Sequence, residues 1–459
     1  MNKVSTVENP LGYERVGRLL ARYAIPSIIS LIINSLYNMV DQIFIGQGVG
    51  FLGNGATNII APIATIAIAV STLFGDGLAA YFSLHLGQGE PEKAAKGVGN
   101  SLISSAVISV IFSILAFAFL QPLCMLFGAT ENILPYAIGY GHIIVAGFPF
   151  AIVATVINSA IRTDGSPKYA MFAMMIGAVI NTILDPVFIF VFHLGVEGAA
   201  FATVLSQFIG FLCNFAYLFR FKNISLQKDS FYVEGSMVGR IASLGFASCF
   251  NNLTSTVVAM VSNNLLTRYG ALSEYGPDIP ITTFGLCMKV SMIAFSVGIG
   301  VASGSQPILG FNYGAKKYRR VKQTFLLSAG ICTLITFLSW IVFQCFPLQL
   351  IRIFGTESEL YEKFAVQCFR IYLLLTFLNG VQMCAGVLFQ AIGQPVKAAV
   401  ASLSKQLLFY VPAMLIVSQI LGLTGILWAG PVADVLAFVL SGVLCIRELK
   451  KMDRMAEDA

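Results

Sequence analysis

The sequence predicts an all-α membrane protein whose twelve transmembrane helices form two pseudo-symmetric six-helix bundles. Three observations lead to this fold class: an apolar composition, a series of long hydrophobic runs, and an internal repeat. Of the 459 residues, 57% are hydrophobic and only 11% are charged, and the mean hydropathy is +0.81. Soluble domains of this length do not have such a composition, whereas polytopic membrane proteins do.

The hydrophobic runs are each long enough to cross a bilayer as a helix. A helix rises about 1.5 Å per residue, and the hydrocarbon core is about 30 Å thick. The twelve runs lie near residues 19–45, 57–86, 98–120, 136–161, 169–192, 197–219, 241–267, 281–309, 323–346, 364–391, 397–420 and 424–446.

The basic residues predict the orientation of these spans. If both termini are cytoplasmic, 22 of the 28 Lys and Arg residues fall on the inner side, and only Arg268, Arg352 and Lys363 fall in outer loops. This asymmetry is the positive-inside pattern of a multi-pass protein of the cell (cytoplasmic) membrane. The net charge of +6 is thereby explained by topology, so no nucleic-acid partner is expected.

The two halves of the chain repeat each other at an offset of roughly 222 to 228 residues. Residues 75–94 resemble 298–317, and DGSPK at 164–168 resembles IGQPVK at 392–397. We therefore predict an amino-terminal lobe at 1–219, a cytoplasmic linker at 220–240, and a carboxyl-terminal lobe at 241–459 with a short cytoplasmic tail. Six spans per half make the repeats parallel, an arrangement typical of secondary transporters that work by alternating access.

Four polar side chains of the first half are predicted to lie at one depth in the membrane. Counted from the nearest basic anchor, Asp41 is about 28 Å along its helix, and Asp185 and Thr203 are each about 26 Å along theirs. Asn181 precedes Asp185 by one turn in NTILDPVFIF (181–190). Carboxylates inside a membrane are costly unless they are paired, solvated or neutralised.

This level of the bundle has two chemical interpretations. Two neighbouring carboxylates favour a shared proton, because like charges raise one of the two proton affinities. Alternatively, a sodium ion neutralises them, with Asn181 and Thr203 supplying further oxygens as hard cations prefer; only then are these four residues metal ligands. The competing interpretation is that Asp41 and Asp185 merely satisfy polar groups between helices.

The helix that carries Asp41 also has a predicted bend and a polar face. Pro26 removes a helix hydrogen bond, and Asn34, Asn38 and Asp41 follow on one face at helical spacing. The two asparagines are equally compatible with hydrogen bonds between helices. Lipophilic cations are the expected substrates, since the acidic pair offers negative charge and the aromatic content of 12% offers cation–π surfaces.

Other charges within the spans have less defined roles. Lys405 and Asp434 on adjacent spans are predicted to pair, Lys289 to reach outward, and Asp76 to serve either helix packing or gating. The nine cysteines and three histidines have no ligand or disulfide spacing, and Walker A, G-x-S-x-G and H-E-x-x-H motifs are absent. We therefore expect neither an enzyme nor a cofactor, with H⁺ or Na⁺ as the source of energy.

Several segments together identify a family. LYNMVDQIFIG at the end of span one, LGQGEPEKA after span two, NTILDPVFIF in span five and GFNYGAKKYRR after span eight resemble the multidrug and toxic compound extrusion (MATE) transporters. The bacterial branch with MepA-like and DinF-like pumps is the most similar. The resemblance covers nearly the whole chain and implies a V-shaped pair of six-helix bundles.

The resemblance also implies an activity and site residues. The family exports cationic or amphipathic compounds against entry of sodium or protons. In members with a cation site in the amino-terminal lobe, the matching positions are Asp41, Asn181, Asp185 and Thr203. Positions that would line the nearby substrate cavity are Pro26, Asn34, Tyr37, Asn38 and Asn158.

Some features distinguish this chain from other members and from rival functions. Some family members carry acidic residues on spans seven and ten, in the carboxyl-terminal lobe. The matching segments of this chain contain no carboxylate, which favours coupling through the amino-terminal lobe. The main alternative is a lipid-linked oligosaccharide flippase of the wider superfamily, which would need a cationic cavity for a pyrophosphate head group. Two other functions, a membrane-embedded enzyme and a non-transporting receptor, fit the sequence less well than a transporter does. The expected partners are amphipathic or cationic small molecules and the lipid bilayer, with the protein as a monomer.

Overall fold

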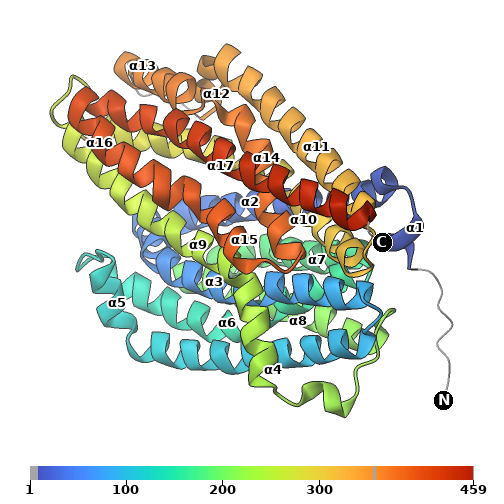
Figure 1. Cartoon of the computed structure of the whole chain (residues 1–459). Coiled ribbons are helices and arrows are strands. Elements are labelled where there is room, and N and C mark those ends of the chain that lie inside the picture. Colours follow the sequence, from blue (N-terminus) through green and yellow to red (C-terminus); the bar gives the residue numbers. More distant parts are fainter. Residues whose placement is uncertain (1–8, 355–357, 458–459) are drawn as a thin grey trace. The chain divides into compact units, whose positions relative to one another are not determined.

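The computed structural model describes residues 9–354 and 358–457, and every regular element in them is a helix (Figure 1). The ends of the predicted lobes, residues 1–8 and 458–459, lie outside this range. The chain divides into two compact units. The amino unit is Ile25–Asn252, and the carboxyl unit combines the segment up to Ala24 with the segment from Leu253 onward.

The helices are long and follow one another through short connections. Those up to residue 231 are α1 (Pro10–Tyr13), α2 (Val16–Gly48), α3 (Phe51–Gly87), α4 (Pro91–Ala118), α5 (Leu120–Leu126), α6 (Leu134–Thr163), α7 (Pro167–Pro186), η1 (Val187–Val191), α8 (Gly195–Tyr217), η2 (Leu218–Arg220) and η3 (Lys228–Phe231). The rest are α9 (Gly235–Gly270), α10 (Asp278–Gly314), α11 (Tyr318–Cys345), α12 (Pro347–Phe354), α13 (Glu359–Gln367), η4 (Cys368–Tyr372), η5 (Thr376–Leu378), α14 (Asn379–Ala391), α15 (Pro395–Leu403), η6 (Ser404–Tyr410), α16 (Val411–Leu421) and α17 (Leu423–Glu457).

The number of spans agrees with the sequence. In the described residues, eleven helices are long and apolar enough to cross a membrane. A twelfth is obtained when Glu359–Tyr372 and Thr376–Ala391, which are bent by 40° at a short break, count as one span. The predicted all-α fold with twelve transmembrane segments is thus confirmed, with the tenth segment broken rather than continuous.

The unit boundaries fall inside two helices. The division between Ala24 and Ile25 lies within α2, and the division between Asn252 and Leu253 lies within α9. The first two turns of α2 therefore pack with the carboxyl unit, and the first half of α9 packs with the amino unit. The lobe boundaries read from the sequence, at residues 219 and 241, remain a prediction based on hydropathy.

The internal repeat reappears as four helix ends with the same geometry. After α3, α6, α10 and α14, the residue in the left-handed region is Gly89, Gly165, Lys316 or Gly393. In each case the next residue donates its N–H to the carbonyl five residues back, at 2.8 to 3.1 Å. This is the Schellman ending of a helix, in which a left-handed residue satisfies the last carbonyl groups. The equivalent turns are 227 and 228 residues apart, in line with the offset seen in the sequence.

Prolines locate the irregular turns within the spans. Pro186 ends α7, and the chain continues as the π-helical segment η1. The π-helical segment η6 is likewise followed by Pro412, the second residue of α16. Proline lacks the N–H that an α-helix needs and crowds the carbonyl four residues earlier, so the hydrogen-bond ladder is reset at these points.

The linker after α8 is fixed to the amino unit at both ends. At its start, Asp164 accepts hydrogen bonds from Tyr217 Oη at 2.8 Å and from the backbone N–H groups of Lys222 and Asn223 at 2.8 and 2.9 Å. Burial raises the pKa of the Asp164 carboxyl above its ordinary value, while the hydrogen bonds from Lys222, Asn223 and Tyr217 lower it.

At the other end of the linker, Asn100 of α4 binds the backbone on both sides of Val233. Its Nδ2 donates to Tyr232 O at 3.0 Å, and its Oδ1 accepts from Glu234 N at 2.7 Å. A Cβ atom on Gly99 would collide with Ser230 O, so the linker packs directly against α4 where the side chain is absent. The segment 221–234 is therefore an ordered part of the amino unit, held by hydrogen bonds and by packing against α4.

Replacing Asp164 with alanine should destabilise the protein. The change removes the carboxylate that accepts hydrogen bonds from Tyr217 Oη and from the N–H groups of Lys222 and Asn223, at about 1–3 kcal/mol for such a loss. Thermal unfolding in detergent, followed by gel filtration of the heated samples, should show a lower midpoint for Asp164→Ala. The exposed Asp229→Ala is the control and should stay close to the parent; equal midpoints for both variants would contradict the role given to Asp164.

Candidate functional site

Three helices of the amino unit bring the predicted acidic residues together. Asp41 lies on α2, Asn181 and Asp185 lie one turn apart on α7, and Thr203 lies on α8. Asp41, Asn181 and Asp185 are buried, and Asp185 is fully so. The sequence-based depth estimate placed these four side chains at one level, and the structure shows them in one cluster.

Asn181 is the centre of the hydrogen bonds in this cluster. Its Nδ2 donates to Asp185 Oδ1 at 3.2 Å and to Thr203 Oγ1 at 3.3 Å. One amide group thus orients the carboxylate on its own helix and the hydroxyl on the neighbouring helix. The spacing of four residues makes this possible, because residues i and i+4 share a helix face.

Three oxygen atoms of the cluster are buried without a hydrogen-bond donor among the described residues. These are Asp41 Oδ1, Asp185 Oδ2 and Asn181 Oδ1. Buried polar atoms in native proteins are nearly always satisfied, so each exception needs an explanation such as a bound ion, water or proton. Two carboxylates, an amide oxygen and a hydroxyl make an all-oxygen set that suits a hard monovalent cation as well as a proton.

The carboxyl groups of Asp41 and Asp185 lie within hydrogen-bonding reach of each other. Two ionised carboxylates have only acceptors, so a hydrogen bond between them forms only when one carries a proton. Without that proton, or a cation in its place, the two negative charges repel each other in surroundings of low dielectric constant. This arrangement is compatible with a proton or a cation held between the two carboxyl groups.

The other aspartates inside the spans have basic neighbours. Asp434 of α17 lies 2.7 Å from Lys405 Nζ in η6, as the sequence predicted, and Lys405 also donates to Asn379 Oδ1 at 2.7 Å. Asp76 of α3 interacts with the charge of Arg162 on α6, a pairing that the sequence did not reveal. Of these four aspartates, Asp41 and Asp185 instead face each other.

Two tyrosines add hydroxyl groups near the acidic pair. Tyr37 of α2 and Tyr140 of α6 both interact electrostatically with Asp41 and with Asp185. Tyr37 was among the predicted cavity residues, whereas Tyr140 was not. Its position within span four gives no sequence signal, because only the packing of α6 against its neighbours brings it to this level.

The remaining predicted cavity residues on α2 are arranged along that helix. Pro26 is buried, and its carbonyl accepts a hydrogen bond from Ser30 Oγ at 2.9 Å. Asn38 Nδ2 donates to Asn34 O at 2.7 Å and to Asn34 Oδ1 at 2.8 Å. Asn38 is exposed and Asn34 is half-buried, so this polar face is open at the surface of the unit.

Asn158 lies elsewhere. Its Nδ2 donates to Ala170 O at 2.9 Å and to Asn214 Oδ1 at 3.3 Å, and so it joins α6 to α7 and α8. Ala170 and Asp185 are separated by about 22 Å along α7, at 1.5 Å per residue. The structure therefore places Asn158 near the opposite end of α7 from the acidic pair, with its side chain engaged in helix packing.

Comparison with known proteins identifies the family. The model of the MatE family matches residues 26–187 and 247–416, well over half of the chain. The chain belongs to the MatE family. Its family membership confirms the resemblance seen in the sequence and makes it a membrane transporter rather than an enzyme.

Curated relatives of this MatE protein match along nearly their whole length. The Multidrug export protein MepA of Staphylococcus saprophyticus subsp. saprophyticus is 24% identical over 451 residues, which cover 96% of this chain and 95% of the relative. The Multidrug export protein MepA of Staphylococcus aureus (strain MSSA476) is 23% identical over 454 residues, covering 96% of both chains.

Solved structures share the fold of this MatE protein. A multidrug resistance MATE family transporter in an outward-facing conformation has a TM-score of 0.90 at 22% identity, covering 99% of this chain and 100% of the other. A MATE in complex with MaL6 has a TM-score of 0.89 at 23% identity, covering 97% and 99%. At such identities the likeness establishes the fold.

Replacing Asp41 with asparagine should stabilise the empty protein at alkaline pH. The amide removes the repulsion with Asp185 and provides N–H donors for its unpaired oxygen, gains of about 1–3 kcal/mol for such buried contacts. The thermal unfolding midpoint of Asp41→Asn at alkaline pH, in sodium-free buffer, should therefore exceed that of the parent. Asp229→Asn, on the exposed linker, should leave the midpoint unchanged. A lower midpoint for Asp41→Asn would mean that Asp41 is satisfied as it stands.

Proposed function

We propose that this MatE protein is an antiporter, driven by H⁺ or Na⁺, that exports amphipathic and cationic compounds across the cytoplasmic membrane by alternating access. The observation that carries the proposal is the acidic pair of Asp41 and Asp185, which is buried, faces no basic residue among those described, and leaves three oxygen atoms unsatisfied. The names of the curated relatives, which are multidrug export proteins, support the choice of substrate class.

The coupling site joins helices whose positions relative to one another can change. Asp41 lies on α2, whereas Asp185 and Thr203 lie on α7 and α8. A bound proton or sodium ion attracts both carboxylates and holds α2 against α7 and α8. Without it, two unit charges about 4 Å apart repel by about 4 kcal/mol at an effective dielectric constant of 20. A two-state element needs about 5.5 kcal/mol to move from 1:99 to 99:1, so loading this site supplies most of the required bias.

Pro26 gives α2 a point at which the helix can bend when the charge state of the acidic pair changes. Pro26 interrupts the hydrogen-bond ladder fifteen residues before Asp41, and the polar face of Asn34 and Asn38 lies between them. When the cation binds, α2 adopts the conformation in which Asp41 meets Asp185. Export follows if that conformation has the lower affinity for the drug, because a ligand shifts an equilibrium only through its differential affinity for the two states.

The charges inside the spans favour a cationic cargo over an anionic one. A flippase for lipid-linked oligosaccharides would need unpaired basic groups to hold a pyrophosphate. Here Lys405 is paired with Asp434, and Arg162 interacts with Asp76. Buried in the interior of the amino unit, the carboxylates of Asp41 and Asp185 have no ion pair among the described residues, and they would repel a pyrophosphate and attract a lipophilic cation.

Transport in proteoliposomes tests the coupling. A fluorescent lipophilic cation should move uphill when either a sodium gradient or a pH gradient is imposed, and Asp41→Asn and Asp185→Asn should each abolish uphill movement. Loss of at least tenfold in initial rate is expected, because the neutral amide cannot exchange a proton or attract a cation. Asp229→Asn serves as the matched control and should transport at the parental rate. If both site variants still concentrate the dye, the acidic pair is structural and the coupling proposal is wrong.

The proposed topology places both termini and the linker in the cytoplasm. Cys345 at the end of α11 is exposed and lies on the predicted outer side, whereas Ser225 in the linker is exposed on the predicted inner side. In intact cells, a membrane-impermeant maleimide should label the parent through Cys345 and should not label Cys345→Ser. Ser225→Cys introduced into Cys345→Ser should react only after permeabilisation; the reverse pattern would invert the topology.

A further inference from the structure

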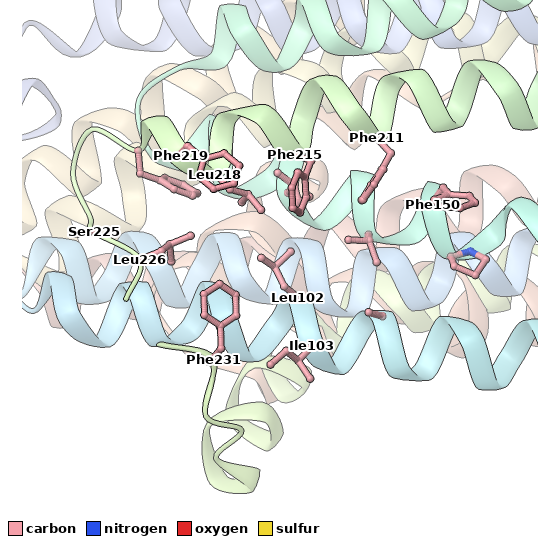
Figure 2. Close-up of a pocket in the computed structure, with 15 residues that line it drawn as sticks. Leu102, Ile103, Phe150, Phe211, Phe215, Leu218, Phe219, Ser225, Leu226 and Phe231 are labelled. Atoms are coloured by element: carbon pink, nitrogen blue, oxygen red, sulfur yellow. The ribbon is translucent and has the colours of Figure 1, made fainter. Parts of the chain in front are cut away.

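An apolar groove on the amino unit lies apart from the acidic pair. It has a volume of about 730 Å³ and is formed by α4, α6, α8 and the linker (Figure 2). Phe150 of α6, Phe211 and Phe215 of α8, and Leu102 of α4 line it, and Leu226 and Phe231 of the linker close one end. This volume is within the range of small-molecule pockets.

The wall of the groove is a continuous aromatic stripe. Phe211 and Phe215 of α8 and Phe219 of η2 follow at four-residue spacing, with successive ring centroids 5.6 and 5.9 Å apart. Along α6 the lining runs from Pro149 to Ile157, a length of about 12 Å at 1.5 Å per residue. Ser225 is the one polar side chain among the lining residues. An elongated groove with this surface suits a flexible hydrocarbon chain.

The groove opens at the exposed surface of the amino unit rather than into its hydrophobic core. Phe219 is 80% exposed and Phe215 is 42% exposed, and both belong to a helix that is long and apolar enough to span the membrane. On the surface of a membrane span, such side chains contact lipid. The groove therefore opens toward the bilayer at the level where α8 ends and the linker begins.

Three basic residues are close in sequence to the lining residues at that end of the groove. Arg220, Lys222 and Lys228 belong to the same segment as the lining residues Phe219, Phe221 and Leu226, and all three are exposed. None of them forms an ion pair with a residue that the structure describes.

Two acids share the linker with these basic residues. Glu234 is engaged by Lys96 at 3.0 Å, and Asp229 is exposed. The end of the groove therefore carries an excess of unpaired positive charge.

We propose that this groove binds an anionic phospholipid, with an acyl chain along the aromatic stripe and the phosphate at Arg220, Lys222 and Lys228. The aromatic lining suits the acyl chain of such a lipid, and the basic segment next to it suits the phosphate. A lipophilic cation, the cargo proposed above, would meet like charges at the mouth and no acid in the groove. The linker does not need to fold around the lipid, because Asp164 and Asn100 already fix it in place.

Fluorescence quenching by brominated lipids measures occupancy of the groove in the full-length protein. Phe215→Trp, in a background with Trp340→Phe and Trp428→Phe, places the only tryptophan of the chain in the groove. Phe219→Trp provides a second reporter at the rim, in case the first disturbs packing. Both are reconstituted in vesicles with rising fractions of brominated phosphatidylglycerol or brominated phosphatidylcholine, and the relative binding constant is fitted.

The anionic lipid should be preferred about tenfold at both reporters, because basic residues at the membrane surface attract anionic head groups. The preference should fall to about one in Arg220→Gln/Lys222→Gln/Lys228→Gln. The matched control is Arg447→Gln/Lys450→Gln/Lys451→Gln on α17, which removes three exposed charges elsewhere and should retain it. Phe172→Trp, on the exposed face of α7, should report no preference.

Three outcomes would overturn the proposal. Equal quenching by the two lipids at both groove reporters would mean that the site does not select an anionic head group. An unchanged preference in the triple linker variant would remove these basic residues from the site. Protection of the reporter by a lipophilic cation such as a fluorescent dye, without displacement by anionic lipid, would assign the groove to cargo. None of these readouts depends on transport, so the test is separate from that of the coupling site.

Discussion

Two carboxyl groups that face each other in the interior of the amino unit are the constraint on which this protein depends. Charges buried in an apolar medium are tolerated when each has a partner of opposite sign, and the aspartates at 76 and 434 follow that rule. Asp41 and Asp185 do not, since each interacts with the carboxyl group of the other and neither forms an ion pair with a described residue. The fold therefore leaves a deficit of one positive charge at a defined place, and a mobile proton or cation is the species that can fill it.

The helix that carries each carboxylate is irregular for a reason that its sequence supplies. Pro186 directly follows Asp185 and resets the hydrogen-bond ladder into a π-helical turn. Pro26 lies within α2, fifteen residues before Asp41. Such interruptions allow neighbouring helical segments to tilt at modest cost, and π-helical turns are frequent at functional sites. Binding chemistry and helix flexibility thus occupy the same two helices.

The frame around this site is repeated, but the chemistry is not. Four helix ends share one Schellman geometry at equivalent positions of the two halves, which gives both halves the same connection between successive spans. In the carboxyl unit, the polar pair near the middle of the spans is Lys405 and Asp434, which neutralise each other. In the amino unit, the shared frame carries a buried acidic pair with no basic partner among the described residues. On the same unit, the linker is held by polar contacts at both ends, which leaves its apolar side chains free to close a groove.

The sequence alone determined the fold class, the number of spans, the repeat and the acidic cluster. Hydrophobic length is a local property, and a helix of known rise converts residue counts into depth, so Asp41, Asn181, Asp185 and Thr203 could be placed at one level. Lys405 and Asp434 were matched as opposite charges on adjacent spans.

Only the tertiary structure decided which side chains at one level touch. Helix rotation and neighbour order set the pairing of Asp76 with Arg162, the approach of Tyr140 to the acids, and the attachment of Asn158 to α7 and α8. The groove and the fixed linker could not be predicted from the sequence either, because they form where Asp164 and Asn100 bind backbone groups more than fifty residues away. Periodicity along one helix carries no information about the rotation of its neighbours, and that rotation determines the site.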